Sequence, residues 1–245
     1  MTTSDQDSNT ADQHAPEESA AESSVVGGFA FFLSLGALLP TGILLTSLTF
    51  FRITSANLEA TLSFIVAGIA GAVLAHLGIK GHISVLIHEF KHSLVSNLVG
   101  NKYKGMKIEQ DSGYFQYAYT KATAHYNAFI SLAPYIVPVF TFIAVLIALT
   151  FFRHDHTLAA LTVGVGYGID LVLNIRDISP IQTDLSLIRG GYYVGLLYIL
   201  AWNLMILGTV CAWVFHGFNG HLMMLEDISA CFLQLYISLF GDPRT

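Results

Sequence analysis

The sequence predicts an all-α polytopic membrane protein with about five or six membrane helices and a small β-hairpin insertion. Of its 245 residues, 53% are hydrophobic and only 11% are charged, and the mean hydropathy is +0.59. A soluble domain carries roughly 25% charged residues. Several apolar stretches reach the roughly 20 residues that cross a bilayer as a helix. These observations exclude an ordinary soluble domain, a disordered chain and a disulfide scaffold.

The charge distribution divides the chain into three parts. Residues 1–24 contain six acidic side chains and no Lys or Arg, so we expect a disordered acidic tail there. Acids and bases balance in the remainder of the chain, and no basic patch indicates nucleic-acid binding. We expect a membrane-embedded domain over residues 25–218, and an amphipathic or packed helix over 219–245.

Polar and glycine-containing segments separate the apolar stretches. The expected membrane helices are Val25–Phe51, Leu58–Leu77, His82–Val99, His125–Phe152, Thr157–Leu173 and Asp184–Phe215. Residues 101–123 differ from all of them, because two strand-like segments flank an Asp-Ser-Gly turn. This composition predicts a β-hairpin, with an irregular loop as the alternative. Cys211 and Cys231 lie in apolar surroundings, which indicates packing residues.

The string His88-Glu89-Phe90-Lys91-His92 is the strongest chemical signal in the sequence. Two His at i and i+4 share one helix face and can bind one zinc ion, and the intervening Glu can act as general base on water. The alternative is that the His side chains only bond to neighbouring helices while Glu89 pairs with Lys91. That pairing has poor geometry, since residues two apart do not share a helix face.

A catalytic zinc ion needs three protein ligands and an open position. The candidates for the third ligand are Asp184, Asp170, Asp177 and His125. Asp184 is favoured because it begins an apolar segment after a proline-containing stretch. Asp170 lies inside a span and is the runner-up, although a hydrogen bond to a neighbouring helix would also explain it. We expect Asp177 to be a solvated loop charge and His125 to be interfacial.

With these motifs the chain resembles the site-2 protease family of intramembrane zinc metalloproteases over roughly residues 58–205. The resemblance lies in Ile87–His92, the strand-rich insertion, a proline-containing next span and an Asn…Pro…Asp string. It implies that His88, His92 and Asp184 bind Zn²⁺ and that Glu89 is the base. It also implies cleavage of transmembrane protein substrates.

The chain departs from the family pattern in two places. The Asn…Pro…Asp string keeps only Asn174, Pro180 and Asp184, with Leu185 where the family has Gly. The family's Gly-Pro-x-x-Asn motif is reduced to Ala133-Pro134. An Asn that would polarise the scissile carbonyl is therefore unassigned, with the candidates Asn127 and Asn174.

The same resemblance implies that the hairpin receives the substrate. A helix in lipid has all its backbone groups paired and must unwind before hydrolysis, and a strand edge offers replacement hydrogen bonds. The candidate edge is Tyr114–Tyr119, and an interfacial aromatic belt is the alternative. The substrate-binding candidates on this edge are Tyr114, Phe115, Gln116 and Tyr117.

These observations predict a zinc metalloendopeptidase that acts on transmembrane or membrane-proximal substrates. One alternative is an inactive zinc-binding scaffold or assembly subunit, against which the intact Glu89 argues. A transporter that uses Asp170 and Asp184 is less favoured. A di-iron hydroxylase needs more paired His than His88/His92 and His154/His156. The expected partners are a transmembrane substrate, the lipid bilayer, and a membrane-protein partner or second copy.

We expect the bacterial inner membrane, with the candidate site towards the cytoplasm. If His82–Val99 counts as a span, the hairpin lysines, Arg52 and Arg176 all fall on the cytoplasmic side, as the positive-inside rule favours. The acidic N-terminus then falls on the opposite side. Arg153 is the exception to this distribution.

Overall fold

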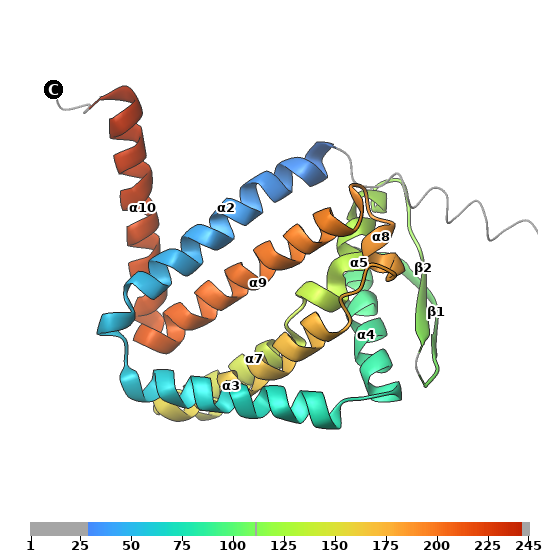
Figure 1. Ribbon diagram of the computed structural model, residues 1–245, viewed down its shortest axis with the longest axis horizontal. Helices are drawn as coiled ribbons and strands as arrows, with labels where there is room; N and C mark the ends of the chain where they lie inside the picture. Colours follow the sequence, from blue (N-terminus) through green and yellow to red (C-terminus); the bar gives the residue numbers. More distant parts are fainter. Residues whose placement is uncertain (1–28, 111, 242–245) are drawn as a thin grey trace, which may run out of the picture.

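The computed structural model describes residues 29–110 and 112–241, so the expected acidic tail lies outside the described residues. Nine α-helices and one two-stranded sheet make up this part of the chain (Figure 1). The helices are α2 (Phe29–Phe51), α3 (Leu58–Gly78), α4 (His82–Leu98), α5 (Asn127–Ile136), α6 (Val139–Phe151), α7 (His156–Arg176), α8 (Thr183–Ser186), α9 (Gly191–His216) and α10 (Phe218–Phe240). The strands are β1 (Lys102–Ile108) and β2 (Gly113–Ala118).

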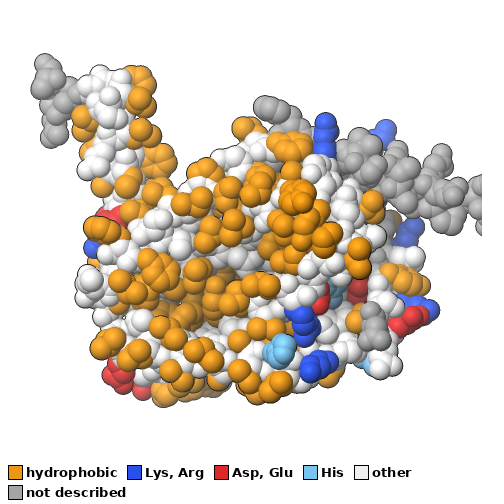
Figure 2. All heavy atoms as spheres, in the orientation of Figure 1, with side chains coloured by type: hydrophobic (Ala, Val, Ile, Leu, Met, Phe, Trp, Pro, Cys, Tyr) orange, Lys and Arg blue, Asp and Glu red, His pale blue; other side chains and the backbone are white. Residues whose placement is uncertain are grey.

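Five of these helices, α2, α3, α7, α9 and α10, are long and apolar enough to cross a membrane. The pair formed by α5 and α6 passes the same test as a broken span, bent by 68°. This confirms an all-α membrane fold with five or six spans. Figure 2 shows apolar side chains over the broad face formed by α2, α9 and α3, which is the surface that lipid would cover.

The sheet is a small antiparallel hairpin, as the sequence predicts. Its register runs from Lys102 opposite Ala118 to Ile108 opposite Gly113, with an irregularity between Tyr103 and Gly105. The hairpin lies beside α4 (Figure 1). It therefore stands next to the helix that carries the His-Glu-x-x-His string.

Close helix packing depends on small residues where α3 and α7 meet. Gly164 of α7 lies against α3, and a Cβ there would come within 2.5 Å of the Phe64 carbonyl oxygen. Gly166, on the opposite side of α7, is as close to Phe140 of α6. Small residues of this kind let membrane helices approach closely.

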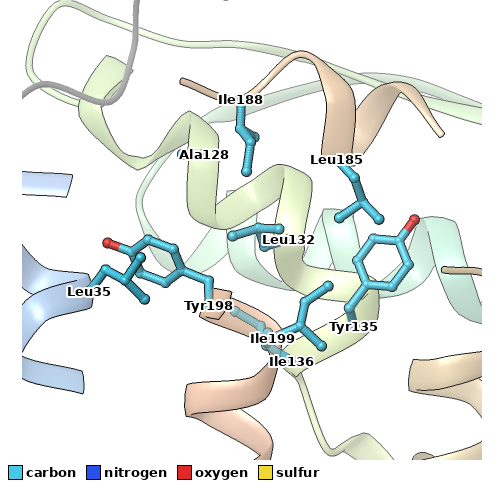
Figure 3. Close-up of a cluster of buried hydrophobic side chains, with 9 residues drawn as sticks. All are labelled: Leu35, Ala128, Leu132, Tyr135, Ile136, Leu185, Ile188, Tyr198 and Ile199. Carbon is cyan, nitrogen blue, oxygen red and sulfur yellow. The ribbon is translucent and has the colours of Figure 1, made fainter. Parts of the chain in front are cut away.

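A buried apolar cluster fixes the short helix α8. Leu185 is fully buried and packs with Leu132, Tyr135 and Ile199, which come from α5 and α9 (Figure 3). The long apolar segment expected from Asp184 is thus divided. α8 is separate from α9, and Gly190 before α9 and Gly191 at its first position have positive φ angles, which glycine adopts without strain.

The expectation that Arg52 and Arg176 lie on the same side of the membrane is wrong. Arg52 precedes α3, whereas Arg176 donates to the carbonyl of Ile79, just beyond the other end of α3. A helix of 21 residues is about 30 Å long, so the two arginines lie at opposite ends of the bundle. The described start of α2 also lies at the Arg176 end, because Phe32 contacts Gly190.

Arg52 and Arg176 were expected on the same side because α4 was counted as a membrane span. α4 has 17 residues and is not among the described helices that could cross a membrane alone. In Figure 1 it runs steeply across the direction shared by α3 and α7. The chain therefore enters and leaves α4 at the same end of the bundle.

Candidate metal centre

The two His of the motif and Asp184 converge on one point. The Nε2 atoms of His88 and His92 lie 3.1 and 3.3 Å from the same Oδ2 atom of Asp184. One ligand atom from each residue lies within 4.8 Å of the others. Among the described residues, this group could hold a metal ion, and its two nitrogens and one oxygen are ligands that zinc prefers.

The outer contact of His92 supports a metal ion between these atoms. Its Nδ1 lies 2.7 Å from the carbonyl oxygen of Ile130, to which it donates a hydrogen bond. With the Nδ1 proton donated to Ile130, the Nε2 atom faces the carboxylate of Asp184 and is available to bind a metal ion. Two acceptors facing each other repel unless a cation lies between them, so the residues fit a bound zinc ion.

Asp184 reaches this point from outside the membrane helices, on α8 between α7 and α9. Burial raises the pKa of its carboxyl group, but His92 and His88 outweigh burial and hold the pKa below its usual range. The carboxylate form is the form that binds metal. α8 itself is anchored by the buried side chain of Leu185.

Glu89 lies in the same cavity as the cluster. The cavity has a volume of about 690 Å³ and is lined by His88, Glu89, His92 and Asp184 among other residues. The Glu89 side chain is buried, and Gly113 of the hairpin packs directly against it. A Cβ on Gly113 would lie 3.1 Å from the Cγ of Glu89.

The hairpin contributes one strand to the wall of the cavity. Tyr114, Phe115 and Tyr117 of β2 line it, whereas Gln116 and the described residues of β1 do not. Tyr117 donates to the Oδ1 of Asn127 over 3.3 Å. Burial raises the pKa of Tyr117 to about 12, so its hydroxyl group remains a neutral donor.

Two other candidates lie away from the cluster. The Oδ2 of Asp170 accepts hydrogen bonds from the backbone N–H and the hydroxyl of Thr141, at 2.6 and 2.8 Å. Asn174 accepts from the Nζ of Lys91. Neither residue lines the cavity. The structure therefore shows Asp170 bonded to a neighbouring helix rather than close to the metal ligands.

Asp177 is not the solvated charge that the sequence suggested. It is partly buried at the cavity wall, with its Oδ2 3.6 Å from the Nδ1 of His88 and its Oδ1 3.4 Å from the Nε of Arg176. Burial raises the pKa of Asp177, but His88 and Arg176 together hold it below its usual value. The ring of His125 packs at a tilt against the ring of Tyr126, and His125 does not line the cavity.

Sequence reasoning missed the roles of Gly113 and Arg176 in building this site. Arg176 donates to the Ile79 carbonyl and to the hydroxyl of Ser84, so it ties the end of α7 to the start of α4. The only signal in the sequence is an Arg at the end of an apolar helix. Such a residue is ordinarily read as a membrane-boundary charge.

Membrane-spanning helices around a His–His–Asp cluster with an adjacent Glu define an integral membrane metallopeptidase. The sequence model of the Peptidase M50B-like family matches residues 60–236, which is most of the chain. The protein belongs to this family, the site-2 protease family. Comparisons with curated proteins and with solved structures gave no match.

Proposed function

We propose that the protein is an intramembrane zinc metalloprotease that hydrolyses peptide bonds of transmembrane or membrane-proximal substrates. One observation carries this proposal. His88, His92 and Asp184 meet within 4.8 Å, and Glu89 lies beside them in the same cavity. The family membership supports a metallopeptidase in general, and the geometry supports the roles of the individual residues.

His88, His92 and Asp184 would hold the zinc ion. Zinc bound there supplies a Lewis acid that polarises a carbonyl and lowers the pKa of water to about 7. The Ile130 carbonyl keeps the lone pair of His92 Nε2 directed at the ion. Glu89 accepts a proton from the attacking water and returns it to the nitrogen of the leaving amine.

The free edge of β2 is the proposed binding site for an unwound substrate. Within the described chain the sheet has two strands, so β2 pairs with β1 on one side only. Tyr114, Phe115 and Tyr117 line the cavity along this strand, whereas Gln116 lies outside the cavity lining. A substrate strand added there would recover the hydrogen bonds that it loses on unwinding. Asn127 supports this edge through Tyr117, whereas Asn174 acts on α4 through Lys91.

The distribution of basic residues supports a cytoplasmic position for the cavity. The cavity end of the bundle carries Lys80, Lys102, Lys104, Lys107, Lys121, Arg176 and Arg189. The opposite end carries Arg52 and Arg153. Blue side chains accordingly gather near the hairpin in Figure 2. The positive-inside rule then assigns the cavity end to the cytoplasmic side, and we propose the bacterial inner membrane.

Metal content tests the site first. We would measure zinc in the purified full chain and in His88→Ala, Asp184→Ala and His154→Ala. His154 is the matched control, because it is an exposed histidine outside the cavity. We expect about one zinc ion per chain in the wild type and in His154→Ala, and none in the other two. A wild type without zinc, even after zinc is supplied, would refute the proposal.

Glu89→Gln tests the chemistry separately. This variant should retain zinc but lose cleavage by roughly 10²- to 10⁴-fold, because the amide cannot accept the proton. Cleavage is measured with a panel of single-span transmembrane peptides as substrates in detergent micelles, and the fragments are identified by mass spectrometry. Cleavage by Glu89→Gln at the wild-type rate would show that another residue is the base.

A further inference from the structure

An ion pair lies buried inside the bundle without contacting the cavity. Lys91 of α4 and Asp170 of α7 are 1% and 2% exposed, and Nζ lies 3.7 Å from Oδ1. Neither residue lines the cavity or belongs to the metal cluster. Charged groups in a membrane interior are costly, so their partners indicate what they do.

Both charges bond to the backbone at the break between α5 and α6. The Nζ of Lys91 donates to the carbonyl of Pro134, at 3.2 Å, near the end of α5. The Oδ2 of Asp170 accepts from the N–H of Thr141, at 2.6 Å, in the first turn of α6. Lys91 also donates to the Oδ1 of Asn174, at 2.8 Å.

The break leaves these two backbone groups without helical partners. In a continuous helix the Pro134 carbonyl would accept from residue 138, but Pro138 has no N–H. The Thr141 N–H belongs to the first turn of α6, where N–H groups lack intrahelical acceptors. Lipid supplies no hydrogen bonds. A cation at the C-terminal end of α5 and an anion at the N-terminal end of α6 also match the helix dipoles.

The same contacts connect the break to the metal cluster. His92, next to Lys91, donates to the carbonyl of Ile130, which lies one helical turn before Pro134. α4 and α5 are therefore joined by two adjacent bonds, from residue 91 to residue 134 and from residue 92 to residue 130. The Lys91 bond fixes the position of α5 along α4, and this position brings Ile130 to His92.

We propose that Lys91, neutralised by Asp170, is a positioning residue of the metal site. It holds α5 against α4 so that the Ile130 carbonyl orients the His92 imidazole towards the metal ion. This inference rests on the proposed metal centre and extends it to two residues that do not touch the ion or the substrate. Removing a hydrogen-bond partner of a metal-bound His typically lowers the metal affinity by 10- to 100-fold.

The test uses the purified full chain with Co²⁺ as a spectroscopic probe of the site. The variants are Lys91→Met, Asp170→Asn and the double variant Lys91→Met/Asp170→Asn. Lys121→Met is the matched control, because Lys121 is exposed and outside the cavity. Three quantities are measured for each protein: the Co²⁺ dissociation constant, the visible absorption spectrum of the bound Co²⁺, and the midpoint of thermal unfolding.

We expect Lys91→Met to bind Co²⁺ at least about tenfold more weakly, with a changed spectrum and a lower unfolding midpoint. Asp170→Asn keeps an acceptor for Thr141 and leaves the hydrogen bond from Lys91 to the Pro134 carbonyl intact. The absorption spectrum of its bound Co²⁺ should therefore match the wild type. Its midpoint of thermal unfolding should fall, because Lys91 loses its counter-charge. The double variant contains no unpaired buried charge. Its midpoint should therefore recover while its affinity and spectrum stay altered.

The double variant decides the outcome, even if Lys91→Met alone fails to fold. A wild-type spectrum and affinity in the double variant would show that Lys91 serves only to neutralise Asp170, and would overturn the inference. A wild-type chain that binds neither Co²⁺ nor Zn²⁺ would contradict the metal centre itself. The two failures are therefore distinguishable.

Discussion

At the scale of single residues, Gly113 connects the hairpin to the chemistry. A Cβ at this position would approach the Cγ1 of Val85 to 2.6 Å and the Cγ of Glu89 to 3.1 Å. Both contacts involve α4, which carries Glu89, the proposed general base. The absence of a side chain at Gly113 therefore sets how closely β2, the proposed substrate-binding strand, can approach Glu89, the proposed base.

Gly113→Ala should retain zinc and lower the rate of cleavage by about 10- to 100-fold, because small displacements of catalytic groups are costly. Gly105→Ala in the paired strand is the control, since a Cβ there would meet only the Oε1 of Gln116 at 3.9 Å. Zinc content and cleavage of the helix panel are measured on both. Equal rates in the two variants would show that the hairpin tolerates displacement at Gly113.

The sequence predicts side-chain positions correctly where the spacing of residues along one helix determines them. His88 and His92 share a face because of helical periodicity, and no tertiary information is needed to predict it. The position of Asp177 was not predictable in this way. Its side chain reaches His88 only because Arg176 ties the end of α7 to Ile79, a contact between residues 97 apart in the chain.

At the scale of secondary-structure elements, the break between α5 and α6 divides the stretch that the sequence presented as one apolar span, His125–Phe152. Both Pro134 and Pro138 lie in that stretch, but only Pro138 ends a helix. Pro134 is accommodated within α5. Which proline breaks the helix depends on the buried partners that satisfy the exposed backbone, and single-sequence patterns do not contain that information.

Gly164→Ala should lower the free energy of unfolding by about 1–3 kcal/mol, because a methyl group would meet the carbonyl oxygen of Phe64 and the Cβ of Ala67. Gly36→Ala on α2 is the control, since nothing lies within 4 Å of a Cβ at that position. Unfolding in detergent, followed by circular dichroism, measures the difference. A stable Gly164→Ala variant would mean that α3 and α7 separate without cost.

At the scale of the whole molecule, the number and type of helices were predictable but their ends were not. α4 was counted as a span because apolar residues flank its charged motif, but it has 17 residues and is not among the described helices long and apolar enough to cross a membrane alone. One crossing counted in error reverses, relative to the hairpin, the side assigned to every segment that precedes α4. For this reason the sequence placed Arg52 with the hairpin lysines. In the structure Arg176 contacts Ile79 at the hairpin end of the bundle, and Arg52 lies at the opposite end.

Accessibility of single cysteines tests the resulting orientation. In a background of Cys211→Ala and Cys231→Ala, Lys121→Cys should react with a membrane-impermeant maleimide only in inside-out vesicles. Arg153→Cys should react only in intact cells, because it lies at the other end of the bundle. The reverse pattern would place the cavity outside the cytoplasm.

The separation of the metal ligands along the chain has a further consequence. His92 and Asp184 are 92 residues apart, so an ion between them closes a loop that contains the hairpin and α5 to α7. An ion bound only in the folded state joins two distant parts of the chain and stabilises that state relative to the unfolded chain. A chelator should therefore make the connection between α7 and α9 the first site of limited proteolysis, while saturating zinc at 100 times its dissociation constant should stabilise the fold by about 2.7 kcal/mol. The ion would then stabilise the folded chain in addition to its proposed role in catalysis.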